Sequence, residues 1–242
     1  MKLLSHISVD CVILGFDGSK LHVLLAERDI LPHEDPGKLS GKYKLPGDMI
    51  GNDESPQDTA FRVLNNYTGR DRLFLKQFEV FGTPGRIKSP NDLMWLQHTT
   101  SMEIDRVITL AYLSLVKIDQ SEPKDVAENL HWIPVDHLPH LIFDHDAIIK
   151  RAFEEVQREL RTDPVGFELL PKKFTIRQLQ QLYEIVFERE LDSRNFRKKI
   201  RNLKYIVPLE EKETGVSHKP AQLFRFDPKL FNKHKKDIGF FI

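Results

Sequence analysis

The chain has 242 residues, of which 40% are hydrophobic and 30% are charged. This length allows one large domain or two ordinary ones, and the composition is typical of a globular protein in water. No apolar run reaches the roughly eighteen residues of a membrane-spanning helix, and residues 1–16 alternate like a strand, unlike a signal peptide. The single cysteine, Cys11, lies in that strand and fits a core position in a reducing compartment, so we expect a cytoplasmic protein.

The net formal charge of zero conceals an uneven distribution. Residues 171–242 carry 17 Lys and Arg against 9 Asp and Glu, whereas residues 1–170 carry 19 against 27. A basic C-terminal part beside an acidic N-terminal part indicates that only the C-terminal part contacts a polyanion.

Residues 1–160 alternate strand-like and helical patterns and are expected to form an α/β domain. Two apolar runs flank the hairpin signal Asp17-Gly18. Apolar residues at helical spacing predict one helix over 55–68, which Gly69 ends, and another from Asp144 or Asp146 to about Leu160. The predicted strands are 5–16, 20–27, 77–82, 106–118 and 130–133.

After an expected linker at 161–173, residues 174–242 have the outline of a winged helix. Thr175 and Gln178 form a capping box that opens a helix to about Arg189. A short helix over 193–203 follows. Two strand-like segments, at 205–211 and 222–226, then flank a polar tip.

Residues 48–70 carry a spacing that resembles the Nudix box of nucleoside-diphosphate hydrolases. That box has a Gly, a Glu six residues on, and then Arg-Glu-hydrophobic-x-Glu-Glu-x-Gly on a helix. Counted back from Gly69, Glu54 and Arg62 stand at their expected places, while Asp48 replaces the first Gly.

The helix glutamates of this box fall on Val63, Asn66 and Tyr67. Positions i, i+3 and i+4 share one helix face, where carboxylates would hold Mg²⁺ against a pyrophosphate. An apolar side chain, an amide and a phenol do not form such a site. The sequence therefore predicts a protein with no metal, cofactor or catalytic residue. The alternatives are a hydrolase with a regulatory tail and a chance match to the motif.

The helix over 193–203 combines an apolar seam of Phe196, Ile200 and Leu203 with basic side chains elsewhere. Such a helix suits the DNA major groove, where Arg and Asn pair with base edges and Lys neutralises phosphate. A solvated charged helix is the alternative. The predicted DNA-binding residues are Thr175, Arg177, Ser193, Arg194, Asn195, Arg197, Lys198, Arg201, His218 and Lys219.

Several segments together resemble the Nudix-related transcriptional regulator family over nearly the whole chain. They are Phe143-Asp144-His145, Leu169 to Glu184, Arg194 to Ile200 and Lys219 to Phe226. The resemblance implies a Nudix-like α/β/α sandwich with a mixed sheet (degenerate box at 48–70), followed by a winged helix. It also implies a homodimeric repressor on palindromic double-stranded operator DNA, with a small effector in the Nudix-like pocket controlling release.

This family has an ADP-ribose-sensing branch, which governs NAD biosynthesis, and a branch that responds to arabinose or a related sugar. Two features favour the second branch, with L-arabinose as effector. The missing metal carboxylates make a neutral ligand more plausible, and the segment between the Gly82–Arg86 turn and Arg106 is expanded. This insert, Ile87–Asp105, brings Trp95, whose ring suits a sugar face. Trp95 in the core or a dimer interface, and ADP-ribose as effector, remain the alternatives.

Charged residues in or beside predicted strands are rarely buried unless they are paired or face a ligand. The predicted effector-binding residues are Asp10, Arg28, Lys44, Trp95 and Arg106. Structural ion pairs of Asp10 with Arg28 or Arg106 are the alternative. His145 is expected to be a structural histidine near a helix start.

Overall fold

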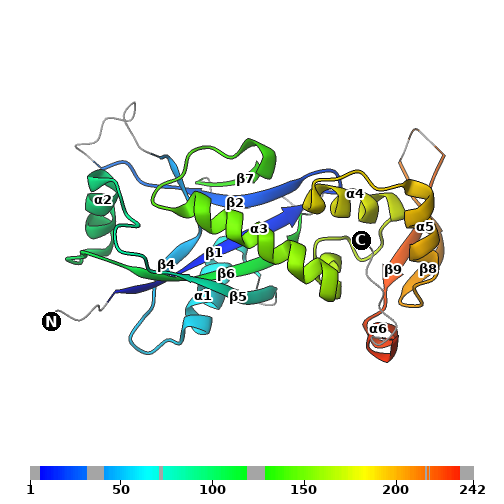
Figure 1. Ribbon diagram of the computed structural model, residues 1–242, viewed down its shortest axis with the longest axis horizontal. Helices are drawn as coiled ribbons and strands as arrows, with labels where there is room; N and C mark the ends of the chain where they lie inside the picture. The colour runs from blue at the N-terminus through cyan, green and yellow to red at the C-terminus, as the bar shows by residue number, and fades with distance from the viewer. Residues whose placement is uncertain are drawn as a thin grey trace. The chain divides into compact units, whose positions relative to one another are not determined.

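The computed structural model describes residues 6–31, 41–70, 73–118, 129–215, 217 and 219–234. The chain divides into two compact units, and Figure 1 traces both. The first consists of Met1–Gly15, His22–Val116 and Glu122–Glu155, and the second of Phe16–Leu21, Lys117–Ser121 and Val156–Ile242. In the part of the chain so described, no helix combines the length and apolar character needed to cross a membrane.

A seven-stranded sheet organises the first unit within the described residues. The strand order is β3-β2-β1-β6-β5, with β4 paired to β1 and β7 paired to β2. The β1–β4, β2–β3, β2–β7 and β5–β6 pairs are antiparallel. The strands are β1 (Ile7–Phe16), β2 (Leu21–Glu27), β3 (Tyr43–Lys44), β4 (Gly47–Met49), β5 (Phe74–Phe81), β6 (Ile108–Lys117) and β7 (Leu130–Pro134).

Strand β1 is buried on both faces, since every residue after Ile7 is buried. Alternate side chains of a strand point to opposite faces, so both faces need a cover. Helix α1 (Pro56–Thr68) covers the face that carries Val9, Cys11 and Ile13. The Ser55 capping box opens this helix, and Gly69 in the left-handed conformation ends it, as the sequence predicts.

The part of helix α3 (His145–Thr162) that belongs to the first unit, up to Glu155, covers the opposite face, in front of the sheet in Figure 1. Its Glu155 accepts a 2.7 Å bond from Lys76, and its Arg151 donates a 2.7 Å bond to Glu79. A bulge between Gln77 and Glu79 turns both β5 side chains to the same face. The layers are therefore helix, sheet, helix, which confirms the predicted mixed α/β Nudix-like domain.

The prediction missed the short strands β3 and β4 and two helical elements of the first unit. The insert contains α2 (Pro90–Thr100), and η2 (Val135–His137) is a short 3₁₀ helix after β7. Ser89 caps α2 by accepting a bond from the Asp92 backbone N–H, and Pro90 occupies the first turn. Ser-Pro-x-Asp is a helix-start signal that the sequence already carried.

The second unit contains the helices and hairpin of a winged helix. Helix α4 (Ile176–Phe187) opens with the predicted Thr175–Gln178 capping box. It is followed by α5 (Ser193–Arg201) and an antiparallel hairpin of β8 (Ile206–Lys212) and β9 (Gln222–Phe226). The C-terminal α6 (Pro228–His234), which the sequence analysis missed, begins where Asp227 accepts backbone bonds from Lys229 and Leu230.

The segment expected to be a linker contributes to the core of the second unit. It contains a 3₁₀ helix, η3 (Pro164–Glu168), and Leu169 and Leu170 are buried. Phe167 stacks on Phe226 with ring centroids 4.3 Å apart. The proline and glycine residues of this stretch form a turn, and the turn is packed because the apolar side chains beside them are buried in the core.

Gly47 sets a tight approach between β4 and β1. A Cβ atom there would lie 2.1 Å from Asp10 Oδ1 and 2.6 Å from the Val9 carbonyl oxygen. We expect Gly47→Ala to lower the free energy of unfolding by about 1–3 kcal/mol, the usual cost of overpacking. Urea titration followed by tryptophan fluorescence measures this, since Trp95 and Trp132 both belong to the first unit.

Gly51→Ala is the matched control, because the nearest atoms that a Cβ would meet there belong to the Glu54 side chain and lie 3.0 Å or more away. Equal loss in the two variants, or no loss in Gly47→Ala, would contradict the steric explanation.

Candidate functional site

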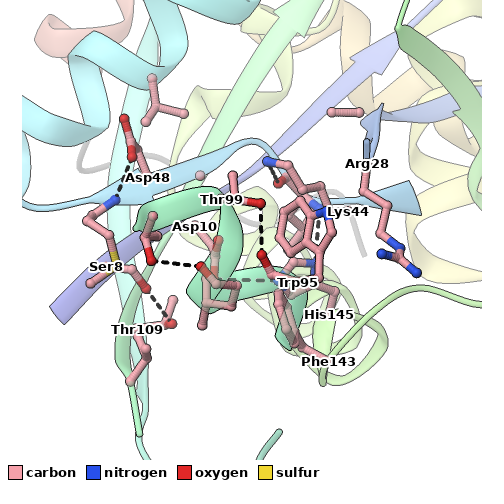
Figure 2. A pocket seen from close by; sticks show the side chains of 18 of the residues that line it. Ser8, Asp10, Arg28, Lys44, Asp48, Trp95, Thr99, Thr109, Phe143 and His145 are labelled. Atoms are coloured by element: carbon pink, nitrogen blue, oxygen red, sulfur yellow. Dashed lines mark hydrogen bonds and ion pairs between the residues drawn. The ribbon is translucent and has the colours of Figure 1, made fainter. Parts of the chain in front are cut away.

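The first unit encloses a cavity of about 380 Å³. Strands β1, β2, β3, β4 and β6, helices α1 and α2, the start of α3 and the loops between these elements supply its wall. Figure 2 shows the polar side chains of Asp10, Lys44 and Thr109 and the rings of Trp95 and Phe143 around this space. The cavity is therefore both charged and aromatic.

Helix α1 presents Val63, Asn66 and Tyr67 to the cavity. The i, i+3, i+4 spacing thus places these side chains where a Nudix helix would present its glutamates. Valine offers no donor atom, and amide and phenol oxygens are poor substitutes for carboxylates around Mg²⁺.

Glu54 and Asp48, the acids that remain of the box, are bound by Arg62. Arg62 donates to Glu54 at 2.6 and 2.8 Å and to Asp48 at 2.6 Å. Chiefly through this contact, the pKa of Glu54 falls to about 2. Among the described residues, no three His, Cys, Asp or Glu side chains are grouped to hold a metal ion. The donor set does not fit Mg²⁺.

Asp10 is a buried carboxylate in the cavity wall. Burial raises its pKa to about 6, and nearby Arg86 and Lys44 oppose that rise. His145 Nε2 faces it at 3.7 Å. A carboxylate so placed is suited to accept hydrogen bonds from a bound ligand.

Arg86 joins two motifs that lie far apart in the sequence. The guanidinium pairs with Asp144 at 2.6 Å and donates to Thr109 of β6 and to the Phe81 carbonyl. The Gly82–Arg86 turn and the Phe143-Asp144-His145 segment therefore meet beside Asp10. Arg86 was not among the predicted site residues, although both motifs were recognised.

His145 is held as a neutral imidazole. Its Nδ1 accepts a 3.0 Å bond from the Leu45 backbone N–H, so its proton lies on Nε2, toward Asp10. Burial, with Lys44 and Arg86 nearby, lowers the pKa of His145 well below its ordinary value. This structural role is the expected one, but His145 also lines the cavity.

Helix α2 forms a wall of the cavity with Trp95. The indole Nε1 donates a 3.0 Å bond to the Asp29 carbonyl, and the ring is only 4% exposed. Arg28 lies 5.9 Å from the ring centroid and donates to the Gly41 carbonyl. The Asp92 carboxylate accepts from the Phe143 N–H, which fastens α2 to the segment before α3.

Four of the predicted effector-binding residues, Asp10, Arg28, Lys44 and Trp95, line the cavity. Arg106 does not: its guanidinium donates to the Gly82 carbonyl, because it turns toward the end of β5 and not inward. The charged or titratable groups that act on Asp10 are Arg86, Lys44, Asp144 and His145, so the alternative of an ion pair with Arg28 or Arg106 is not what the structure has.

In the second unit, α5 exposes a basic surface. Asp192 caps the helix through the Asn195 N–H at 2.7 Å, and Phe196 and Ile200 anchor it in the core. Leu203, the third residue of the predicted seam, lies beyond the helix end. The predicted groove-facing side chains are all exposed, namely Ser193, Arg194, Asn195, Arg197, Lys198 and Arg201.

Other predicted DNA-binding residues have structural tasks. Thr175 is buried as the cap of α4, and Ser193 Oγ lies 2.9 Å from Gln180 Nε2. Gln180 also donates to the Leu191 carbonyl, which fixes the turn between α4 and α5. Arg177 on α4 and Lys219 after the hairpin tip are exposed. His218 lies outside the described residues.

The fold and its two sites define a class of protein in which a mixed α/β Nudix-like domain precedes a winged helix. Residues 166–226 match the family described as the NrtR DNA-binding winged helix domain. The chain is 26% identical over 225 residues to the ADPR responsive transcriptional repressor NtrR of Acinetobacter baylyi. The matched region covers 90% of this chain and 81% of that protein.

Solved structures agree at the level of the fold. Shewanella oneidensis NrtR, complexed with a 27mer DNA, superposes with a TM-score of 0.71 at 23% identity, covering 93% of this chain and 95% of that one. A MutT/nudix family protein from Enterococcus faecalis gives 0.64 at 21% identity, covering 94% and 90%. These likenesses show the fold, a Nudix-like domain followed by a winged helix.

The raised pKa of Asp10 predicts a pH dependence of stability. Between pH 3.8 and about 6 the folded state keeps a proton that the unfolded state releases. The contribution of Asp10 to stability is therefore lost as pH rises through this window. Relative to Asp10→Asn, we expect the wild type to lose about 2–3 kcal/mol of unfolding free energy from pH 4 to pH 7.

Urea titrations at several pH values, followed by tryptophan fluorescence, measure this difference. Exposed Asp53 supplies the control variant, Asp53→Asn. A wild-type minus Asp10→Asn difference that stays constant across the range would rule out the proposed protonation.

Proposed function

We propose that this protein is an effector-controlled transcriptional repressor that binds operator DNA through α5 and the adjacent hairpin. The observation that carries the proposal is the match of residues 166–226 to the NrtR DNA-binding winged helix, in which α5 exposes five basic side chains over a buried Phe196–Ile200 anchor. Arginine and asparagine on such a helix read base edges, and lysines neutralise phosphate. Binding as a homodimer to a palindromic operator is part of this proposal.

The effector that fits best is ADP-ribose, bound in the cavity of the first unit without hydrolysis. The relative from Acinetobacter baylyi carries the description ADPR responsive. The cavity of about 380 Å³ offers the cations Lys44 and Arg28 together with the partly exposed ring of Tyr67. These groups suit a ligand with phosphates and an aromatic base. The family resemblance then implies regulation of NAD metabolism.

L-arabinose, favoured on sequence grounds, finds no support among these relatives. Trp95 is nearly covered, which leaves little ring surface for stacking on a sugar. Hydrolysis of the effector is disfavoured because α1 lacks the carboxylates that the Nudix reaction uses. Both alternatives are decided by the ligand experiment below.

Substitution of Arg197 tests the DNA-binding helix. We expect Arg197→Ala to weaken operator binding by about 1–3 kcal/mol and to relax sequence preference, if the guanidinium pairs with a base. Fluorescence anisotropy with the DNA upstream of the protein's own gene and of neighbouring genes, at several salt concentrations, supplies the measurement. Affinity should fall steeply with salt.

Lys150→Ala is the control, since Lys150 is an equally exposed cation on α3 of the first unit. Loss of affinity in both variants to the same degree would indicate a general charge effect. If the wild-type protein shows no preference for particular DNA sequences, the proposal is wrong.

The effector is tested by adding ADP-ribose, L-arabinose and xylose separately to the full chain. A ligand that binds only the folded state raises the thermal midpoint, so we expect a rise with ADP-ribose and none with either sugar. The same ligand should release operator DNA in the anisotropy assay. A rise with arabinose alone would restore the sugar hypothesis, and Mg²⁺-dependent loss of ADP-ribose would restore the hydrolase.

A further inference from the structure

Lys44 of β3 reaches the part of the cavity where the eroded Nudix helix presents Tyr67. Lys44 Nζ lies 3.3 Å from Tyr67 Oη and 3.4 Å from the Leu45 carbonyl oxygen. It also lies 5.7 Å from the centroid of the Tyr67 ring. Tyr67 stands at the last glutamate position of the box, so an ammonium group adjoins a position that would ordinarily ligate a divalent cation.

Within the described part of the chain, no ion pair neutralises the charge of Lys44. Its ammonium group donates hydrogen bonds to a phenol oxygen and to a backbone carbonyl oxygen, both uncharged. Two other cations near the cavity are held by carboxylates. Arg86 pairs with Asp144 at 2.6 Å, and Arg62 is held by Glu54 and Asp48. Lys44 therefore retains positive charge for a ligand.

Three of the acidic side chains that line the cavity have other cationic or polar neighbours. Glu27 is paired with Lys42 at 2.9 Å, and Asp48 is paired with Arg62 at 2.6 Å. Asp10 lies beside Arg86 and His145, and Lys44 acts on its carboxyl less strongly than Arg86 does. An incoming phosphate would thus meet Lys44 as an accessible cation with only weak, neutral partners to displace.

We propose that Lys44 takes the place of the missing divalent cation and binds a phosphate or diphosphate group of the effector directly, so that recognition needs no metal. The proposal rests on the proposed function only in taking ADP-ribose as the ligand. An ammonium donates up to three hydrogen bonds and acts on phosphate as a point charge, which suits this role. On this proposal, the absence of the glutamates and the presence of Lys44 have one explanation. The site binds an anion through an ammonium group and not through a metal ion.

The test is isothermal titration calorimetry of the full chain with ADP-ribose, in excess EDTA and in excess Mg²⁺. We expect the wild-type affinity to be the same in both. Lys44→Met, which keeps length and removes charge, should weaken binding about tenfold to a hundredfold, as expected for lost hydrogen bonds to a charged group. Lys44→Arg should recover part of it, and Lys150→Met should change nothing.

Two further probes separate the phosphate from the rest of the ligand and guard against misfolding. Lys44→Met should weaken the binding of ADP by the same factor. The affinity for adenosine, where adenosine binds, should be unchanged. Tryptophan fluorescence and the thermal midpoint check that Lys44→Met is folded, and Lys44→Arg keeps the test valid if it is not. An absolute requirement for Mg²⁺, or unchanged affinity in Lys44→Met, would overturn the proposal.

Failure of the effector assignment gives a different result. If wild-type protein binds no ADP-ribose under either condition, ADP-ribose is not the effector, and ADP and inorganic diphosphate become the probes. Binding of either that weakens in Lys44→Met keeps Lys44 as an anion site. No binding of any phosphate compound overturns both proposals.

Discussion

The ion pair of Arg86 and Asp144 joins the elements that meet beside Asp10 in the cavity wall. The guanidinium contacts the start of α3 through Asp144, β6 through Thr109 and the end of β5 through the Phe81 carbonyl. A buried charge is tolerated only when its partners satisfy it, and here they come from three separate elements. Asp10 and His145 are positioned against this group. The Asp10 carboxylate could not lie so deep without a cation beside it, and the neutral His145 depends on the same neighbourhood.

Much of the framework follows from local patterns. Ser55, Gly69 and apolar residues at helical spacing predict α1, and Thr175 with Gln178 predicts α4, because caps and periodicity are properties of neighbouring residues. Arg86 could not be found in this way, since its burial depends on Asp144, 58 residues away. Arg106 was assigned to the pocket from its place beside a strand, but sequence position does not say which way a long side chain turns. Helix α2 escaped notice because Trp95 and Asp92 are its only buried residues, which leaves little apolar periodicity.

The insert that was interpreted as a sugar-binding feature has a different physical basis. Trp95 packs with Leu31 and Ile142 and donates its indole N–H to the chain, so the ring mainly secures α2. With α2 fixed, Leu96, Thr99 and Thr100 line the cavity on the side of that helix. The Thr99 and Thr100 hydroxyls donate to backbone carbonyls within the helix at 2.9 and 2.7 Å. The helix thus shapes the cavity more than it supplies free polar contacts.

Helix α1 is held in place by packing and capping that need no carboxylate at the predicted box positions. Ala60, Val63 and Leu64 pack into the sheet, and the caps at Ser55 and Gly69 close the helix ends. Val63 and Tyr67 also line the cavity, so two of the three predicted glutamate positions contribute contacts to this packing. Arg62 ties Glu54 and Asp48 to the helix, a structural task that needs no metal. A hydrolase framework can therefore be kept as a receptor, provided another group supplies the positive charge that an anionic effector requires.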